Sequence, residues 1–271
     1  MRLRILPLCA FMLISLSCSE RNQEHNAIES RLVANSITDT FPGAVPFHEY
    51  VDSLLFFLYT VHNISQDRIL LGQSSCMDDV INTKTAFARH AVKGPFNLGG
   101  LAGLPFTGIT GYNAFAHHVP DQGAALIFLG SHTGYSSKHG WGKIIREGQQ
   151  EPSSCCGAIV NALDKLKKGE IVKMMPHGDD YQEEVIEQLA LQHKKELMSA
   201  KDPLITFTKQ IYQESENMIL NFPLTNTNFK YLILVVGVII NTDHGDPDFI
   251  WVDHMAIYDL EMERQLRGME E

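Results

Sequence analysis

Three cysteines and one histidine stand in the sequence where proteins often place metal ligands. Cys76 ends the apolar stretch DRILLGQSSC, and His132 follows the apolar stretch AALIFLG. Cys155 and Cys156 are adjacent and come directly before GAIVNALDKLKKGE, which has the pattern of a helix. A disulfide between these neighbours is disfavoured, because consecutive Cα atoms lie about 3.8 Å apart and disulfides prefer about 5.5–6 Å. We therefore expect these two thiols to have a role other than a disulfide between them.

A zinc ion is the partner that suits these side chains. Two thiolates and one imidazole are typical zinc ligands, and three protein ligands leave a fourth position for water, as in catalytic zinc sites. A helix N-terminus also lowers the pKa of a thiol and favours the thiolate that binds metal. The alternative is that the cysteines are single buried residues that only fill the core.

The segments around these residues predict one layered domain over residues 42–265. In chain order we expect a helix over residues 45–64, a strand over 67–76, a helix over 77–92, a strand over 124–134, a helix after Cys156, amphipathic helices over 179–201 and 203–222, and antiparallel strands over 228–243 and 248–262. We assign no helix or strand to the glycine-dense passage 94–123. Strands mixed with helices predict an α/β fold with a partly parallel central sheet and flanking helices. Proteins with such sheets bind small molecules and ions at the carboxyl ends of the strands, so residues 76, 132 and 156 could meet there.

The first 18 residues differ from the rest of the chain. Arg2 and Arg4 precede an apolar run from Ile5 to Leu16, which is shorter than a membrane span of about 20 residues and has the layout of a secretory signal peptide. The run ends in SLSC, which loosely resembles a lipobox, so Cys18 could carry a lipid that anchors the protein to a membrane. Residues 19–41 would then be a polar tether. We expect export to the periplasm or to a membrane surface; the alternative is a cytoplasmic protein.

Charge and cysteine usage argue against two classes of protein. The chain has 32 acidic and 22 basic residues and a net charge of −10, and no basic stripe offsets this, so we expect no nucleic-acid partner. Only three cysteines follow the N-terminal segment, and an odd number does not form a disulfide framework. The glycine-dense passage holds neither a GxGxxG nor a P-loop motif, so a nucleotide loop has no support.

A longer pattern in the middle of the chain resembles a known family. The stretch NLGGLAGLPFTGITGYNAFAHHVPDQGAALIFLGSHTGYS, followed by WGKIIREGQ and SSCCGAI, is similar to the limiting-CO2-inducible protein B/C family. That family is also described as theta-class carbonic anhydrase, with a fold similar to the beta class. The resemblance covers about residues 45–258 and implies a homodimer and a Zn²⁺ ion held by Cys76, His132 and Cys156. Cys156 is preferred to Cys155 because the glycine after it matches the CG of the family pattern.

The resemblance also implies residues that act beside the metal. Asp78, two residues after Cys76, matches the beta-type aspartate that accepts a hydrogen bond from the zinc-bound water. Val80 stands where the beta-type pattern has an arginine, so Arg146 in KIIREGQ is the candidate partner of Asp78. Without such a partner, Asp78 could bind the metal itself and close the site. His118 in AFAHHVPD could relay protons, since an imidazole titrates near neutral pH; the alternative is a structural hydrogen-bonding role.

These features predict a zinc-dependent carbonic anhydrase that reversibly hydrates CO2 to bicarbonate. Zinc lowers the pKa of a bound water from about 15.7 toward about 7, which supplies hydroxide near neutral pH. One alternative is a non-catalytic zinc-binding relative that senses or binds CO2 or bicarbonate, and another is a zinc hydrolase for a different small substrate. The acidic stretch NTDHGDPDFIWVDH could hold a hard cation, but we expect a solvated hairpin turn there.

Overall fold

The computed structural model describes residues 30–81, 83–223 and 228–262. The chain divides into two units, residues 1–42 and 43–271. In the first unit, residues 30–40 form a helix within the segment predicted as a tether. The predicted signal peptide with Cys18, and residues 19–29, lie outside the described residues, so export and lipidation stay predictions.

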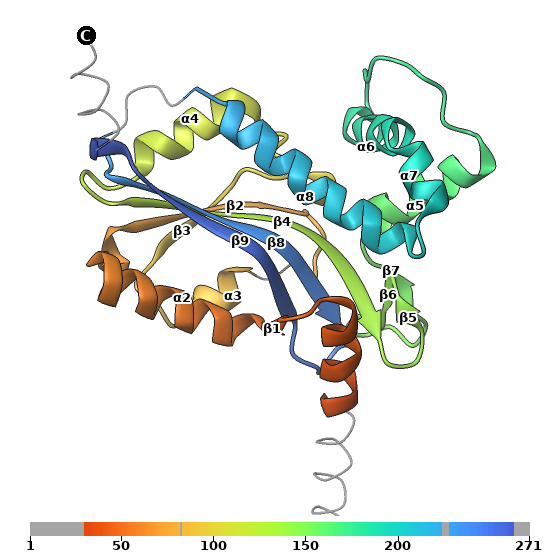
Figure 1. The fold of residues 1–271 in the computed structure, drawn as a ribbon, viewed down its shortest axis with the longest axis horizontal. Coiled ribbons are helices and arrows are strands. Elements are labelled where there is room, and N and C mark those ends of the chain that lie inside the picture. The colour runs from red at the N-terminus through yellow and green to blue at the C-terminus, as the bar shows by residue number, and fades with distance from the viewer. Residues whose placement is uncertain (1–29, 82, 224–227, 263–271) are drawn as a thin grey trace, which may run out of the picture. The chain divides into compact units, whose positions relative to one another are not determined.

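Within the described residues, the second unit is built on a seven-stranded sheet (Figure 1). Neighbouring strands follow the order β1-β9-β8-β4-β2-β3, and β5 pairs with β4. Their bounds are β1 (Val45–Pro46), β2 (Ile69–Ser75), β3 (Lys93–Asn97), β4 (Ala124–Ser136), β5 (Gly140–Trp141), β8 (Tyr231–Thr242) and β9 (Phe249–Asp259). The strands β3, β2, β4 and β8 run parallel, whereas β9, β1 and β5 pair antiparallel with their neighbours. A separate two-stranded sheet joins β6 (Lys143–Ile144) to β7 (Ser153–Ser154).

Helices cover both faces of the large sheet (Figure 1). On one face lie α2 (Phe47–His62) and α3 (Thr83–Phe87), and on the other lie α4 (Gly108–His118) and α8 (Pro203–Asn221). Next to one end of α8 pack α5 (Gly157–Lys168), α6 (Tyr181–Gln192) and α7 (Lys194–Ser199). Two 3-10 turns complete the described elements, η1 (Gln66–Arg68) and η2 (Leu101–Gly103). None of the helices in the described ranges is long and apolar enough to cross a membrane.

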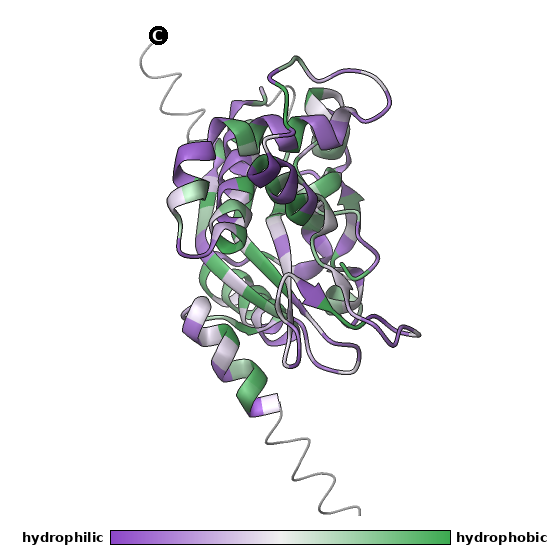
Figure 2. Ribbon diagram, turned by 90° about the vertical axis from the view of Figure 1, so that its right-hand side faces the viewer, coloured by the Kyte–Doolittle hydropathy of each residue, from purple (hydrophilic) through white to green (hydrophobic). Residues whose placement is uncertain are grey.

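The two central strands are apolar along most of their length. Because helices cover both faces of this parallel sheet, β4 and β8 read as nearly continuous hydrophobic runs rather than as alternating patterns. Hydrophobic residues concentrate on these strands and on the helix faces turned toward them, while loops and outer helix faces are mainly hydrophilic (Figure 2). The apolar strands thus form a rigid support for residues at their ends.

Two apolar clusters pack the helices, one of them against the sheet and the other among the helices themselves. On the α2 face, Leu54 packs with Phe128 of β4 and Val235 of β8. The second cluster joins α5, α6 and α8, and both Cys76 and Cys156 belong to it. The candidate ligands therefore lie at the edge of a packed core, where their positions are held by the surrounding side chains.

The α/β class and the partly parallel central sheet are confirmed. The helix predicted over 77–92 is wrong in extent, because only α3 is helical there and residues 77–81 form a loop in which the Ile81 N–H donates to the Asp78 carbonyl. The glycine-dense passage holds β3 and α4. Tyr112 and Phe115 of α4 are buried, and this packing outweighs the low helix propensity of its glycines.

One glycine in the sheet makes a direct stability prediction. The register of β8 against β9 shifts between Val236 and Gly237, and a Cβ at Gly237 would overlap the carbonyl oxygen of Trp251. We expect Gly237→Ala to lower the free energy of unfolding by about 1–3 kcal/mol, the usual cost of overpacking, as measured by urea denaturation. Gly130→Ala is the control, because a Cβ there would make only ordinary contacts, with the Ile239 side chain at 3.6 Å and the Gly237 carbonyl oxygen at 3.9 Å. Equal stability of the two variants would contradict this account of the bulge.

Candidate metal centre

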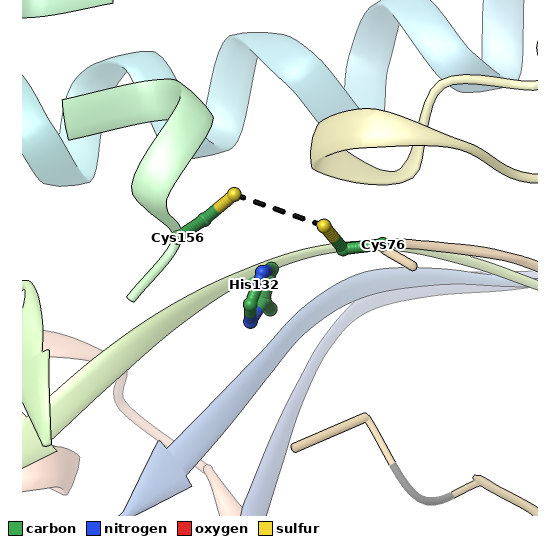
Figure 3. A group of neighbouring side chains, drawn as sticks. All are labelled: Cys76, His132 and Cys156. Atoms are coloured by element: carbon green, nitrogen blue, oxygen red, sulfur yellow. Dashed lines mark hydrogen bonds between the residues drawn. The ribbon is translucent and has the colours of Figure 1, made fainter. Parts of the chain in front are cut away.

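Cys76, His132 and Cys156 converge at one end of the sheet. Cys76 directly follows β2, His132 lies in the carboxyl-terminal half of β4, and Cys156 is the N-cap residue directly before α5. Because β2 and β4 are adjacent and parallel, their carboxyl ends meet, as the sequence argument required. The three ligand atoms lie within 4.8 Å of one another, and the two sulfur atoms are 3.8 Å apart (Figure 3). All three side chains are buried.

The His132 ring has one nitrogen engaged and the other free. Its Nδ1 lies 2.9 Å from Oδ1 of Asn241. Its Nε2 is buried and finds no hydrogen-bond partner among the described residues; the nearest carboxylate oxygen, on Asp78, is 3.9 Å away. Leaving a buried polar atom unpaired costs about 1–3 kcal/mol. A metal ion between this nitrogen and the two sulfur atoms would remove that cost, so the donor set fits zinc.

The electrostatics of the Cys76 thiol also favour a cation at this position. The neighbouring Cys156 thiol and burial both raise the pKa of Cys76, and the nearby His132 ring only partly offsets them. The Cys76 thiol therefore resists becoming a thiolate unless a cation lies beside it. A divalent ion would cancel the charge of two thiolates.

Asp78 is paired with Arg146, the partner suggested by the sequence. One terminal nitrogen of the guanidinium lies 2.9 Å from both carboxylate oxygens, and its Nε donates to Asp79 at 3.1 Å. Burial by itself would raise the pKa of the Asp78 carboxyl, but its contacts with Asp79 and Arg146 outweigh this and hold the pKa below its ordinary value. Asp78 is therefore a carboxylate next to the candidate metal position.

Arg146 also joins two of the ligand-bearing segments. A second terminal nitrogen donates to the Ser153 hydroxyl and, at 3.3 Å, to the Ser154 carbonyl. These serines form β7, directly before the cysteine pair. The guanidinium thus ties the loop after Cys76 to the segment that leads into Cys156.

A cavity of about 440 Å³ opens onto this centre. It is lined by Cys76 and Asp78 together with Gln73, Ser75, Met77, Ile81, Asn97 and Gly99. Because one candidate metal-binding thiol and the ionised carboxylate both line it, a small molecule in the cavity would lie beside the candidate metal position.

The adjacent Cys155 lies on the opposite side of the histidine ring. Its Sγ is 3.5 Å from Nδ1 of His132 and 3.8 Å from Oδ1 of Asn241. Gly134 makes room for it, since a Cβ at that position would lie 2.8 Å from the Cβ of Cys155. Asp78, His132 and Cys155 form a second grouping with metal-ligand spacing. The first grouping fits better, because the second has its only thiol on the side of the ring that is bonded to Asn241.

His118 is not part of this centre, which corrects the prediction of a proton relay there. It lies exposed at the last position of α4, with its ring centroid 5.8 Å from that of Phe96. In the sheet, Phe96 of β3 pairs with Gly72 of β2. Gly72 in turn pairs with Ile127 of β4, which comes five residues before His132. Ile127 therefore lies about 16 Å from His132 along β4, toward the amino end of the strand. The helix runs toward the amino end of β4, so its last residues face away from the metal centre.

The acidic stretch near the C-terminus is the turn between β8 and β9, as predicted. The Asp243 carboxylate accepts hydrogen bonds from the Ser136 hydroxyl at 2.7 Å and from the Ile145 N–H at 2.8 Å. Asp248 accepts from the Thr242 N–H at 3.1 Å. These carboxylates hold the turn to its neighbours, and both metal-type groupings among the described residues contain His132 instead.

Comparison with known proteins shows which family has a sequence like this one. The family model of limiting CO2-inducible proteins B/C, beta carbonic anhydrases, matches residues 44–259. The chain belongs to this family. Within the same fold, the crystal structure of PtLCIB4, a homolog of the limiting CO2-inducible protein LCIB, is 27% identical, covering 83% of this chain and 95% of that chain with a TM-score of 0.73. The structure of LCIB itself is 17% identical and shows likeness of fold alone, covering 83% and 98% with a TM-score of 0.62. No curated protein sequence matches the chain.

Asn241 is a residue of the candidate site that was not identified from the sequence. It is 1% exposed and ends the apolar run of β8, so it occupies the same kind of position as Cys76 and His132. A polar residue at the carboxyl end of a buried parallel strand was the signal that selected those two ligands. Applied to YLILVVGVIIN, the same rule would have selected Asn241.

The buried turn carboxylate makes a pH-dependent prediction. Burial raises the pKa of Asp248 to about 6 from an ordinary value of 3.8. A pKa that is higher in the folded state contributes stability at low pH, and this contribution is lost as the pH rises through about 6. The neutral variant Asp248→Asn, whose amide oxygen can still accept from Thr242, should therefore gain stability over the wild type at pH 8 by at most about 3 kcal/mol.

Urea denaturation of both proteins at pH 4 and pH 8 checks this expectation. The difference between the variant and the wild type should grow in favour of the variant between these two pH values. A difference that is the same at both, or that favours the wild type at pH 8, is incompatible with a protonated Asp248 in the folded state at low pH.

Proposed function

We propose that this chain is a zinc-dependent carbonic anhydrase that catalyses the reversible hydration of CO2 to bicarbonate. The observation that carries the proposal is the pairing of Asp78 with Arg146 beside a Cys76, His132 and Cys156 triad. Membership of a family of beta carbonic anhydrases supports the same activity.

Each of the site residues has a separate part in this proposal. Cys76, His132 Nε2 and Cys156 would hold the ion, which when bound supplies a Lewis acid that makes water acidic near neutral pH. Asp78 is placed to accept a hydrogen bond from a water in the fourth position. Arg146 keeps that carboxylate ionised and oriented, because its guanidinium contacts both oxygens.

The position of Asp78 also bears on whether the site is open. A carboxylate that closed the site would turn an oxygen toward the metal. Here both oxygens lie 2.9 Å from Arg146, and the nearer one is 3.9 Å from the His132 nitrogen that faces the metal position. This arrangement supports an exchangeable fourth position and favours the catalyst over the non-catalytic zinc-binding relative.

Substrate and proton would exchange through the cavity beside Cys76 and Asp78. His118 lies elsewhere, so the proposal assigns it no part in proton transfer. The proton released on hydration would leave through this cavity to solvent or buffer.

The two adjacent cysteines offer a matched test of the proposal. We expect Cys156→Ala to lose the bound zinc and to reduce CO2 hydration to the rate of buffer alone, because it removes one of three protein ligands. Cys155→Ala, one residue away and equally buried, should keep about one zinc ion per chain. Stopped-flow CO2 hydration and metal analysis of the purified chains measure both effects.

The outcomes separate the alternatives. A zinc-loaded wild type that hydrates CO2 no faster than Cys156→Ala would be a non-catalytic zinc-binding protein, and the proposed activity would be wrong. Zinc loss in Cys155→Ala with full zinc in Cys156→Ala would move the metal to the second grouping and contradict the ligand assignment.

A further inference from the structure

We propose that Asn241 is a positioning residue that decides which nitrogen of His132 is available to the metal. The inference rests on the proposed zinc site and adds to it a residue that touches neither metal nor substrate. Asn241 lies at the end of β8, is buried, and makes polar contacts to the segments that carry the ligands.

The direction of each hydrogen bond follows from a main-chain carbonyl. The Asn241 Nδ2 lies 3.1 Å from the carbonyl oxygen of Val80, which can only accept, so the amide must donate there. Its Oδ1 is then turned toward His132, at 2.9 Å from Nδ1. A carbonyl-type oxygen can only accept, so the ring proton must lie on Nδ1. The other nitrogen, Nε2, is then unprotonated, and its lone pair is available to a metal.

The sheet register places Asn241 where it can do this. Ile239 is level with His132, and Asn241 is level with Gly134, two residues further along both strands. Side chains two residues apart on a strand share one face, so Asn241 and His132 project from the same face of the sheet. Gly134 has no side chain to fill the space beside Asn241, and Cys155 occupies it.

Asn241 also connects the three segments that supply the metal ligands. His132 belongs to β4, Val80 belongs to the loop that follows Cys76, and Cys155 directly precedes Cys156. The Cys155 thiol lies 3.8 Å from the same Asn241 oxygen and can donate to it. A single amide therefore contacts every ligand-bearing segment from the side opposite the metal position.

This role predicts a loss of metal affinity when the amide is removed. Without the acceptor at Nδ1, the ring proton can move to Nε2, where it competes with the metal. Residues that orient a metal-binding histidine in this way typically account for 10–100-fold in affinity. We expect Asn241→Leu, which has a similar volume and no polar atoms, to weaken zinc binding by about that factor.

Two further variants make the test specific. Asn241→Asp keeps an acceptor for Nδ1, loses the amide donor to Val80 and gains a carboxylate charge that favours a nearby cation, so its zinc affinity should not fall below that of the wild type. Thr133→Val is the matched control: Thr133 is fully buried next to His132 on the opposite face of β4, and its hydroxyl has no hydrogen-bond partner among the described residues. It should bind zinc like the wild type.

Two readouts besides activity test the proposal on the full chain. Zinc affinity is measured by competition with a chelator, and ¹⁵N NMR of the zinc-loaded protein reports which His132 nitrogen carries the proton. We expect the proton on Nδ1 in the wild type, in Thr133→Val and in Asn241→Asp. An Asn241→Leu variant with wild-type zinc affinity, or a wild-type ring protonated on Nε2, overturns the inference.

The experiment also separates this inference from the proposed function. If Asn241→Leu fails to fold, Asn241→Asp decides: zinc affinity at or above that of the wild type supports the role, and a loss of 10–100-fold contradicts it. If the wild type binds no zinc, the proposed function fails. The ring proton of the metal-free protein at alkaline pH is then read in the same way: Nδ1 supports the inference and Nε2 overturns it.

Discussion

The candidate site depends on two buried sulfur atoms that lie 3.8 Å apart, of which Cys76 borders the cavity. The neighbouring Cys156 thiol and burial each raise the pKa of Cys76, so its thiolate needs a positive charge beside it. The Nε2 of His132, which has no hydrogen-bond partner among the described residues, is the ring nitrogen left for the same cation. The fold has therefore gathered two sulfur atoms and one imidazole around one small volume, a donor set that suits a soft divalent cation.

The parallel sheet makes this arrangement possible. It brings the carboxyl ends of β2, β4 and β8 to one edge, and each of these ends contributes a polar residue: Cys76, His132 and Asn241. The start of α5 closes the group from the remaining side with Cys156. Around these residues Arg146 holds Asp78 and β7 on one side of the imidazole, and Asn241 holds Val80 on the other. The candidate ligands are held in place by contacts among their neighbours as well as by their own strands.

Much of this site could be predicted from the sequence, for a physical reason. Cys76 and His132 end apolar strands, Cys156 begins a helix, and topology brings such positions together whatever their separation in the chain. Arg146 was suggested by the absence of an arginine at Val80. Other features could not be read in this way. The segment 77–92 has the charge pattern of a helix, but its first residues are held in a loop by contacts to Arg146 and Asn241, which are distant in sequence.

The prediction for His118 failed for a similar reason, since its distance from the metal centre depends on the direction in which α4 crosses the sheet. The part played by Cys155 was also beyond the sequence, because it depends on the space that Gly134 leaves beside the imidazole. Contacts between distant segments decide both, and no local pattern records them.

The most direct test of the central claim is X-ray absorption spectroscopy at the zinc edge of the full-length, zinc-loaded protein. The account predicts two sulfur neighbours at about 2.3 Å and two lighter neighbours, one nitrogen and one oxygen, at about 2.0–2.1 Å. A shell with three sulfur atoms, or a protein that does not retain zinc at all, would contradict it.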